Sequence, residues 1–384
     1  MKTRLINSIT ELSKKQWDQC AYTDETGLNP FCSYGFLSAL EQSGCVKAET
    51  GWLAQYIILS DDQDQILGVM PLYLKNNSQG EYVFDHAWAN AFTHAGGQYY
   101  PKLQCSIPFS PVTGPRLMIN PDAPKEKCQK LLLQSAISYA KKRAVSSLHF
   151  TFLEDNEIDV MTSEGLLIRQ DQQFHWLNND YKSFNQFLET LSSRKRKNIN
   201  RERRCVHDND IEIEIISGSQ IQEFHWDHYF EFYLNTANKK WGQPYLNREF
   251  FSLLGENIPE NLLLIMASRE GRYIAGALNL IGKDTLYGRY WGAVEHHKFL
   301  HFEVCYYQAI EYAIKNGLTK VEAGAQGEHK LSRGYEPTIT HSAHWIDNPS
   351  FKDAIENFLN QERKAVDQDV EYLKNYLPFK KSTG

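Results

Sequence analysis

The sequence has no hydrophobic run long enough to cross a membrane, which takes about 18–20 consecutive apolar residues. Its longest tight apolar cluster, 262–267, has the length of a buried strand. Polar residues between positions 8 and 15 interrupt any apolar segment behind Lys2 and Arg4, so no export signal is visible. These absences predict a cytoplasmic protein without a membrane span.

Cysteine is scarce and scattered, with seven residues, an odd number, and no C-x-x-C pair. This excludes a disulfide framework or a zinc ribbon and favours a reducing compartment. The pairs His225/His228 and His341/His344 have metal-like spacing, but no carboxylate or cysteine pattern completes a site, so no metal is predicted. The G-x-S-x-G, Walker and dinucleotide-binding fingerprints are also absent, which excludes the common hydrolases, NTPases and dehydrogenases.

The remaining composition is that of a globular protein, with 42% hydrophobic and 23% charged residues in a chain of 384. This length accommodates two ordinary domains. The net charge of −6 conceals a basic cluster, because residues 194–204 contain seven Lys or Arg and a single Glu. A basic cluster on an otherwise acidic chain predicts a local anionic partner.

The chain partly repeats itself, which sets the expected architecture. Residues 136–140 and 309–313 both read A-I-x-Y-A, and a strand-like run follows each. In both copies the strand is reached at the same distance, so His149 and Glu322 each lie thirteen residues after the first alanine of the motif.

A second pair of matching segments lies upstream. Residues 66–72 resemble 274–280, and each follows a polar turn and an apolar strand. Each half therefore reads as a β-hairpin, a further strand, a helix and a strand. The first half differs by an insertion of about 35 residues, placed at about 76–118. The predicted fold class is α/β (α+β), with two tandem domains that each have a mixed sheet flanked by helices.

The polar stretch Gln170–Asp180 is interpreted as the loop between domains, which gives a first domain of 1–175 and a second of 176–384. Apolar spacing from Phe184 to Leu191 predicts a helix whose continuation carries the basic cluster. Further helices are predicted at the following ranges: 222–240, 247–254 and, as an amphipathic C-terminal helix, 350–376.

Several long stretches resemble a known family. They are 29–31 with 36–41, 68–75, 99–104, 111–116, 240–245, 286–292 and 321–330. The hairpin–helix–strand order resembles the GNAT (acyl-CoA N-acyltransferase) superfamily, and two copies in one chain resemble the FemAB-type proteins. Over about 29–350 the chain is similar to a bacterial family of predicted FemAB-like N-acyltransferases.

This resemblance implies an enzyme that moves an acyl or aminoacyl group onto an amine of a small or envelope (peptidoglycan) precursor. The donor would be an acyl-CoA or an aminoacyl-tRNA. The glycine-rich loop with which GNAT enzymes hold the CoA pyrophosphate is missing, since 295–300 contains no glycine. FemAB-type ligases that use charged tRNA share this departure. The alternative is a catalytically degenerate GNAT-fold module that binds tRNA or a phosphorylated ligand.

Acyl transfer to an amine requires an anchored carbonyl, a group that stabilises the oxyanion, and a proton acceptor. Glu322 ends a strand and is followed by a glycine-containing loop that reaches Lys330, an arrangement that resembles the strand–loop–lysine segment of FemAB-type proteins. Lys330 is expected to stabilise negative charge, and Glu322 to accept the amine proton. His301 and Glu303 open the helix that carries Ala309 and Ala313, where the helix N-terminus favours a neutral, basic imidazole, as suits a general base. An ordinary capping or packing histidine is the structural alternative.

The candidate binding residues fall into three groups, each with a structural alternative. Substrate binding is predicted for residues of the second half, namely Arg289, Trp291, Gln326 and Glu328, although Arg289 also suits a structural carboxylate. Lys102 and Arg116 flank turns of the insertion, where Gly114 and Pro115 alone explain the turn geometry. Phosphate binding is predicted for the helical residues Arg194, Lys195, Arg196 and Lys197, although charge runs often only face solvent.

Overall fold

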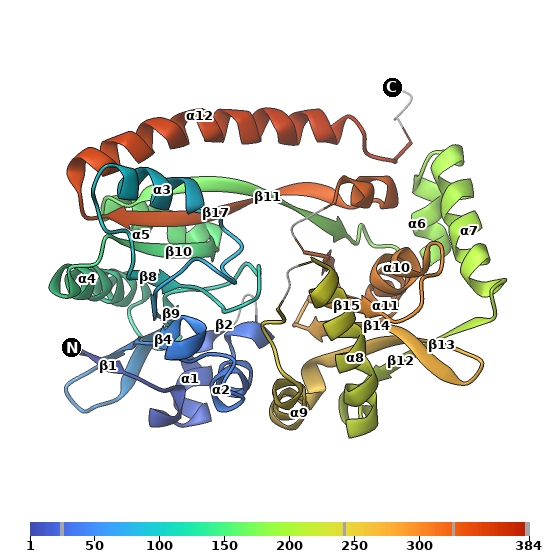
Figure 1. Ribbon diagram of the computed structural model, residues 1–384, viewed down its shortest axis with the longest axis horizontal. Coiled ribbons are helices and arrows are strands. Elements are labelled where there is room, and N and C mark those ends of the chain that lie inside the picture. The colour runs from blue at the N-terminus through green and yellow to red at the C-terminus, as the bar shows by residue number, and fades with distance from the viewer. Residues whose placement is uncertain (24–26, 241–242, 325–326, 381–384) are drawn as a thin grey trace. The chain divides into compact units, whose positions relative to one another are not determined.

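The computed structural model describes residues 1–23, 27–240, 243–324 and 327–380 (Figure 1). Contacts divide the chain into two compact units. Unit 1 contains Met1–Asp171 and Ile339–Gln368, and unit 2 contains Gln172–Thr338 and Asp369–Gly384. Three long elements contribute residues to both units: β11 (Leu167–Leu177), β17 (Glu336–Ile346) and α12 (Pro349–Lys374).

Unit 1 contains two groups of paired strands. One has the order β1-β5-β6-β9, with bounds Lys2–Ile6, Tyr56–Ser60, Ile66–Met70 and Met118–Ile119. The other has the order β17-β10-β8-β7-β4, in which the last four span Ser147–Leu153, Lys102–Cys105, Tyr73–Lys75 and Trp52–Ala54. A short pair, β2 (Tyr22–Thr23) and β3 (Gly27–Leu28), lies apart from both.

The helices of unit 1 pack on these strands. They are α1 (Lys14–Ala21), α2 (Tyr34–Gln42), α3 (His86–His94), α4 (Lys125–Arg143) and α5 (Asp155–Ser163). Leu132, Leu133, Ala136 and Ala140 of α4 enter the core beside strand residues such as Leu148. The 3.6-residue spacing of these apolar positions explains why this segment is helical and which face it buries.

Unit 2 has one group of paired strands in the order β12-β13-β14-β15-β16-β11. Apart from β11, they span Ile211–Ser217, Leu262–Arg269, Arg272–Ile281, Thr285–Ala293 and Lys320–Glu322. Neighbours are antiparallel except β15 and β16, which are parallel. The helix between β15 and β16 provides the crossover that a parallel pair requires.

Helices cover both faces of the strands of unit 2 (Figure 1). On one face lie α8 (Glu223–Lys240) and α9 (Arg248–Asn257). The other face is covered by a continuous helical segment made of α10 (Leu300–Phe302), a π-helical turn (Glu303–Tyr307) and α11 (Gln308–Lys315). Leu263, Ile265 and Ala267 of β13 point to this second face, where α6 (Phe184–Thr190) also packs. The basic helix α7 (Ser193–His207) follows α6.

Each unit is completed by a strand from the other half of the sequence. In unit 1, β10 pairs with β17, so that His149 lies opposite His344. In unit 2, β16 pairs with β11, so that Glu322 lies opposite His175. Contacts therefore place 339–368 in unit 1, whereas the sequence-based division at 175 put these residues in the second domain.

Both hairpins, both repeat helices and the strands after them are present as predicted, and so is the order of elements in the two halves. The predicted helices at 222–240, 247–254 and 350–376 are also confirmed, as α8, α9 and α12. No helix among the described residues has the length and apolarity to cross a membrane.

Two local predictions were wrong. Residues 170–177, interpreted as a loop because they are polar, belong to β11. The polar residues hide the strand because residues 173–176 are all buried, including Gln173 and His175, so no alternation of polar and apolar positions marks it. The predicted single helix from Phe184 into the basic cluster is two helices, because the backbone is extended at Leu191 and Ser192.

Candidate functional site

In unit 2, the parallel strands β15 and β16 pair only over a short distance. Their ladder runs from Thr285/Lys320 to Tyr287/Glu322, where β16 ends while β15 continues to Ala293. Within the described chain, the β16 side of β15 therefore has no strand partner beyond Tyr287. The two strands therefore separate beyond Tyr287 and Glu322.

A β-bulge at Tyr290 increases the bend of β15 at the same place. Ala277 of β14 lies opposite Trp291 and Leu278 lies opposite Arg289, so Tyr290 is the extra residue. Its φ of 51° lies in the left-handed region, which a tyrosine rarely adopts. The hydroxyl of Tyr229 in α8 donates a hydrogen bond to the Tyr290 carbonyl and holds the bulge. Bulges of this kind re-aim side chains and often lie beside active sites.

A buried group of charged residues lies where the two strands separate. The carboxylate of Glu322, only 1% exposed, is 3.0 Å from Lys320 Nζ and 3.4 Å from Arg289 Nη2. Arg289 Nη1 also donates to the backbone carbonyl of Glu322, at 3.2 Å. Across the β11–β16 ladder, His175 Nε2 lies 3.9 Å from the same carboxylate. Glu322 is therefore surrounded by three basic side chains.

The protonation states in this group follow from burial and charge. Burial, together with the Lys320 and Arg289 cations, lowers the pKa of His175 to about 4, so its imidazole is neutral at pH 7. Burial alone would raise the pKa of Glu322, but its basic neighbours hold it below the ordinary value. Glu322 is thus ionised at neutral pH and is a weak proton acceptor.

Lys330 lies beside this group, on the 3₁₀ helix Glu328–Arg333. Its side chain is 2% exposed and its Nζ donates to the carbonyl of Gly324, at 2.7 Å. Burial, helped by the Arg289 cation, lowers the pKa of Lys330 to about 7. A buried lysine that exchanges a proton near neutral pH has the property expected of a catalytic acid or base.

Aromatic side chains lie around the start of the helical segment after β15, and of these Trp291 and His301 are partly exposed whereas Tyr306 is buried. The rings of Trp291 and His301 are 5.3 Å apart, and those of His301 and Tyr306 are also 5.3 Å apart. The hydroxyl of Tyr306 and Nε2 of His329, next to Lys330, are 2.9 Å apart and share a hydrogen bond. The structure thus brings Trp291 and His301 together, near the loop that carries Lys330.

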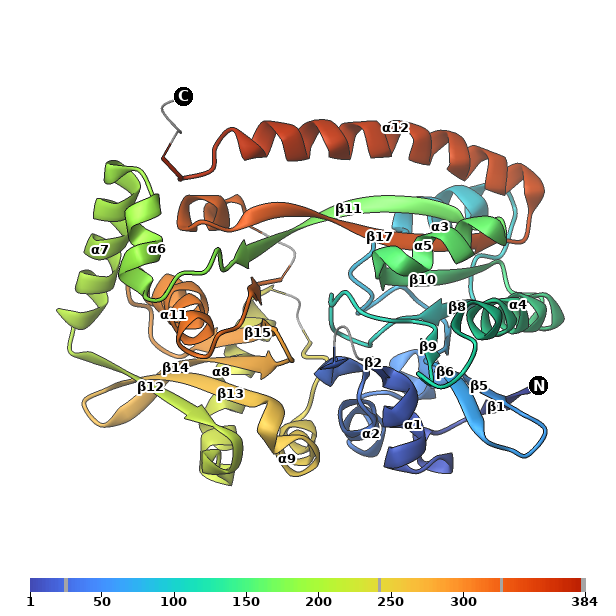
Figure 2. The ribbon, with the colours of Figure 1, turned by 180° about the vertical axis from the view of Figure 1, so that it is seen from behind.

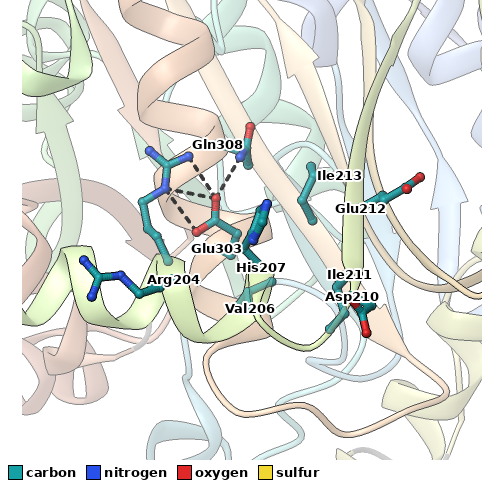
Figure 3. Close-up of a pocket in the computed structure, with 10 residues that line it drawn as sticks. Arg204, Val206, His207, Asp210, Ile211, Glu212, Ile213, Glu303 and Gln308 are labelled. Atoms are coloured by element: carbon teal, nitrogen blue, oxygen red, sulfur yellow. Dashed lines mark hydrogen bonds and ion pairs between the residues drawn. The ribbon is translucent and has the colours of Figure 1, made fainter.

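Glu303 occupies a different place from His301. It begins the π-helical turn and its carboxylate accepts hydrogen bonds from Arg203 of α7, at 3.1 Å, and from Gln308, at 2.7 Å. These residues line a pocket of about 680 Å³ between α7, β12 and the helical segment (Figure 3). Its floor includes Ile211 and Ile213. Glu303 is therefore neutralised by Arg203 and directed toward α7.

The four residues of the predicted phosphate site do not act as one group. Lys195 donates to the hydroxyl of Ser332, at 2.9 Å, and is half-buried, as is Arg196. Arg194 and Lys197 are exposed. Farther along α7, Glu202 pairs with Arg333 at 2.7 Å, which fastens the helix to the segment that contains Lys330.

Lys102 and Arg116, the two candidates in the first half, are both buried inside unit 1 with 0% exposure. Arg116 donates to the backbone carbonyls of Val112, Gly114, Pro115 and Thr151. Its donors thus hold turns of the insertion together. Lys102 Nζ contacts Glu81 at 2.7 Å and Asp85 at 2.5 Å. Both side chains have internal partners and no exposure to a ligand in solution.

Sequence reasoning missed a second buried polar group, which corresponds to the Glu322 group by the repeat. His149 occupies the position of Glu322, and its Nδ1 lies 2.7 Å from Nδ1 of His344. Asp85 lies 3.8 Å from His149 and links it to Lys102. Burial, with the Lys102 cation, lowers the pKa of His149 to about 3. The equal thirteen-residue spacing of His149 and Glu322 was the signal that could have found it.

Two predicted residues cannot be placed. Gln326 lies outside the described residues, and so does the side chain of Glu328. In the part of the chain that is described, no three His, Cys, Asp or Glu side chains are arranged to hold a metal ion.

Comparison with solved structures identifies the fold. FemX matches with a TM-score of 0.56 and 13% identity, over 93% of this chain and 100% of its own. A conserved protein of unknown function from Bacteroides thetaiotaomicron matches with a TM-score of 0.53 and 14% identity, over 90% and 100% of the two chains. L-PGS from Bacillus licheniformis matches with 0.51 and 8%, over 81% and 90%. The predicted tandem GNAT-like fold is thus confirmed.

A search of curated proteins found no match to this sequence. The sequence profile of the FemAB-like family, described as peptidoglycan biosynthesis/recognition, matches residues 8–381, which is nearly the whole chain. The chain therefore belongs to the FemAB-like family.

Proposed function

We propose that the chain is an N-acyltransferase that moves an acyl or aminoacyl group onto an amine, with its reaction centre where β15 and β16 separate. The observation that carries this proposal is Lys330, a lysine 2% exposed whose Nζ donates to the carbonyl of Gly324, in the loop that follows β16. The family's description, peptidoglycan biosynthesis/recognition, supports an envelope precursor as the acceptor. The fold shared with FemX supports the class of reaction. An acyl-CoA and an aminoacyl-tRNA are the two candidate donors.

In this mechanism the acceptor amine attacks the carbonyl carbon of the donor. A C–N bond forms, and the C–O or C–S bond to the carrier breaks as the carrier leaves with the electron pair. The amine proton passes to the neutral Lys330 Nζ, which then gives it to the departing carrier.

Glu322 has a different role in this mechanism from the one expected from sequence. Because its pKa is held below the ordinary value, it accepts protons poorly at neutral pH. Its carboxylate instead positions Arg289, whose guanidinium is fixed at the mouth of the strand separation. Arg289 is then the cation that faces negative charge on the donor or on the tetrahedral intermediate.

Replacing Lys330 by methionine is expected to lower the initial transfer rate by at least about 100-fold, the effect of removing one group that acts on the reacting centre. The assay would supply radiolabelled acetyl-CoA or aminoacyl-tRNA with a nucleotide-linked peptidoglycan precursor. Lys315→Met, which removes an exposed lysine from α11, is the matched control and should retain the wild-type rate. A Lys330→Met enzyme with full activity would exclude this lysine as the proton acceptor.

Two further outcomes separate the alternatives. If neither donor yields a product while the wild-type chain still binds tRNA or a phosphorylated precursor, the chain is a degenerate binding module. If Lys330→Met lowers the melting temperature as well as the rate, the rate is compared with that of the wild type at a temperature well below both melting transitions. Recovery of the wild-type rate there would assign Lys330 a purely structural role.

The transfer rate of the wild type is expected to rise with pH and to level off above about 7, the pKa of Lys330. Only the neutral amine of Lys330 accepts a proton, and burial makes this form abundant at neutral pH. The measurement is the pH dependence of kcat between pH 5.5 and 9 for a donor that saturates the enzyme. A rate that falls as pH rises through 7 would instead assign the charged lysine to stabilising the oxyanion.

A further inference from the structure

The exposed side of α7 carries a straight row of cations. Arg194, Lys197, Arg201 and Arg204 are all exposed and are spaced by three, four and three residues. At 100° per residue this spacing keeps the four side chains within one narrow arc of the helix surface, along about 15 Å of its axis. These four residues form the basic row of α7.

The rest of α7 is occupied by its own unit. Ile199 and Val206 are buried on the opposite side of the helix. Arg203 is held by Glu303 and Glu311, whereas Lys195 is held by Ser332. No member of the basic row forms an ion pair with a carboxylate of the described residues. The helix thus separates its cations into an inward group with partners and an outward group without ion-pair partners.

Helix stability does not explain the cations at the start of the basic row, although it favours Arg204 in the last turn. Arg194 lies in the first turn of α7, which contains no acidic residue, and Lys197 follows directly after this turn. The N-terminal end of a helix carries partial positive charge, which disfavours cations there. The helix also lacks a side-chain hydrogen bond at its N-cap, Ser192. A run of basic residues that is unfavourable for the isolated fold is expected when an external anion compensates it.

Exposed tyrosines lie next to the start of the basic row. The amide of Ser192 donates to the carbonyl of Pro378, which brings the end of the chain against the beginning of α7. Just before Pro378, Tyr372 and Tyr376 are 59% and 54% exposed, and their rings pack at 4.9 Å. Tyrosine is enriched where proteins meet the headgroup layer of a membrane, because its ring is apolar and its hydroxyl is polar.

We propose that the basic row of α7 docks this protein on a membrane surface rich in anionic phospholipids, with Tyr372 and Tyr376 in the headgroup layer. A flat anionic layer complements a straight row of cations on α7, whose place beside α6 in unit 2 is seen in Figures 1 and 2. A single-stranded nucleic acid is matched less well, because its binders hold the strand in a positively charged groove, whereas the four cations lie on the exposed side of one helix. This docking is independent of the acyltransferase proposal.

The test is co-sedimentation of the full-length protein with phosphatidylcholine vesicles that do or do not contain one-third phosphatidylglycerol. Each cation near an anionic surface contributes roughly fivefold to binding. The variant R194Q/K197Q/R201Q/R204Q is therefore expected to lose roughly several-hundredfold in partition coefficient on anionic vesicles. Binding of the wild type should also fall steeply when salt rises from about 0.1 M to 0.5 M, because these charges are exposed.

The matched control is K125Q/K127Q/K141Q/R143Q, which removes four exposed cations from α4 and the same total charge. It should bind anionic vesicles like the wild type. Lys330→Met should bind them equally well, so a failure of the acyltransferase proposal leaves this result intact. Equal losses in the α4 and α7 variants would overturn the proposal. Tighter, salt-sensitive binding of the wild type to a structured RNA than to the vesicles would also overturn it.

Discussion

Replacing Lys102 by methionine is expected to lower the free energy of unfolding by about 3–5 kcal/mol, measured by chemical denaturation. Lys102 is fully buried between Glu81 and Asp85, which lie 2.7 and 2.5 Å from its Nζ. Removing the cation leaves two carboxylates buried without their main partner. Methionine nearly matches the volume of lysine, so loss of charge rather than a cavity causes the effect.

A double-mutant cycle with Asp85→Asn isolates the ion pair. Neutralising Asp85 in the Lys102→Met background should recover part of the lost stability, because one uncompensated carboxylate disappears. The control substitution Lys141→Met, at an exposed position of α4, should change the free energy of unfolding by less than about 0.5 kcal/mol. If Lys102→Met is as stable as Lys141→Met, the buried group does not hold the insertion in place.

The loss of unfolding free energy in Lys102→Met should also depend on pH, because the neighbouring carboxyl groups of Glu81 and Asp85 can bind protons. Burial, partly offset by the Lys102 cation, raises the pKa of Glu81 to about 7, whereas that cation helps to hold the pKa of Asp85 below its ordinary value. Without Lys102, both groups bind protons more readily in the folded protein than in the unfolded chain. Stability of the variant relative to the wild type is then expected to improve from pH 8 to pH 5.

Local patterns predicted most of the helices and hairpins but not the pairing of strands across the sequence. The helix at 223–240 and the two A-I-x-Y-A helices follow from apolar spacing alone. The pairing of β11 with β16 joins residues about 145 positions apart in sequence and depends on which strand edges are free. No local signal specifies that choice. The sequence therefore did not predict that β11 pairs with β16 of the second half, or that β17 pairs with β10 of the first half.

The part of the candidate site that lies at the end of a strand could be predicted from the sequence. The parts that depend on the angular position of residues around a helix, or on which strands pair, could not. Glu322, Arg289 and Lys330 lie together because β16 ends beside Arg289 of β15 and the segment that follows β16 carries Lys330. His301 and Glu303 are two residues apart on a helix, so they point about 200° apart and cannot share a site. His175 was missed because its strand was taken for a loop, although the strand exchange sets it opposite Glu322.

Replacing Gly292 by alanine is expected to lower the free energy of unfolding by roughly 3 kcal/mol or more. A Cβ at Gly292 would lie 2.0 Å from the backbone carbonyl oxygen of Phe232 in α8. Gly276, the partner of Gly292 across the β14–β15 ladder, also lies under Phe232. This pair of glycines lets α8 approach the strands, and a helix backbone cannot move aside as a flexible side chain can.

Gly288→Ala, on the same strand, is the control for this prediction. There a Cβ would meet Asn279 Oδ1 at 3.3 Å, a contact that a small side-chain movement relieves. Because alanine is otherwise preferred to glycine within a strand, this change should cost little. Thermal melts of Gly292→Ala and Gly288→Ala are compared. A loss of stability in Gly292→Ala alone assigns the effect to the close approach of α8, whereas equal losses would assign it to any added side chain on β15. Since Tyr229 of α8 also holds the bulge at Tyr290, a displaced helix should lower transfer activity even where the Gly292→Ala protein remains folded.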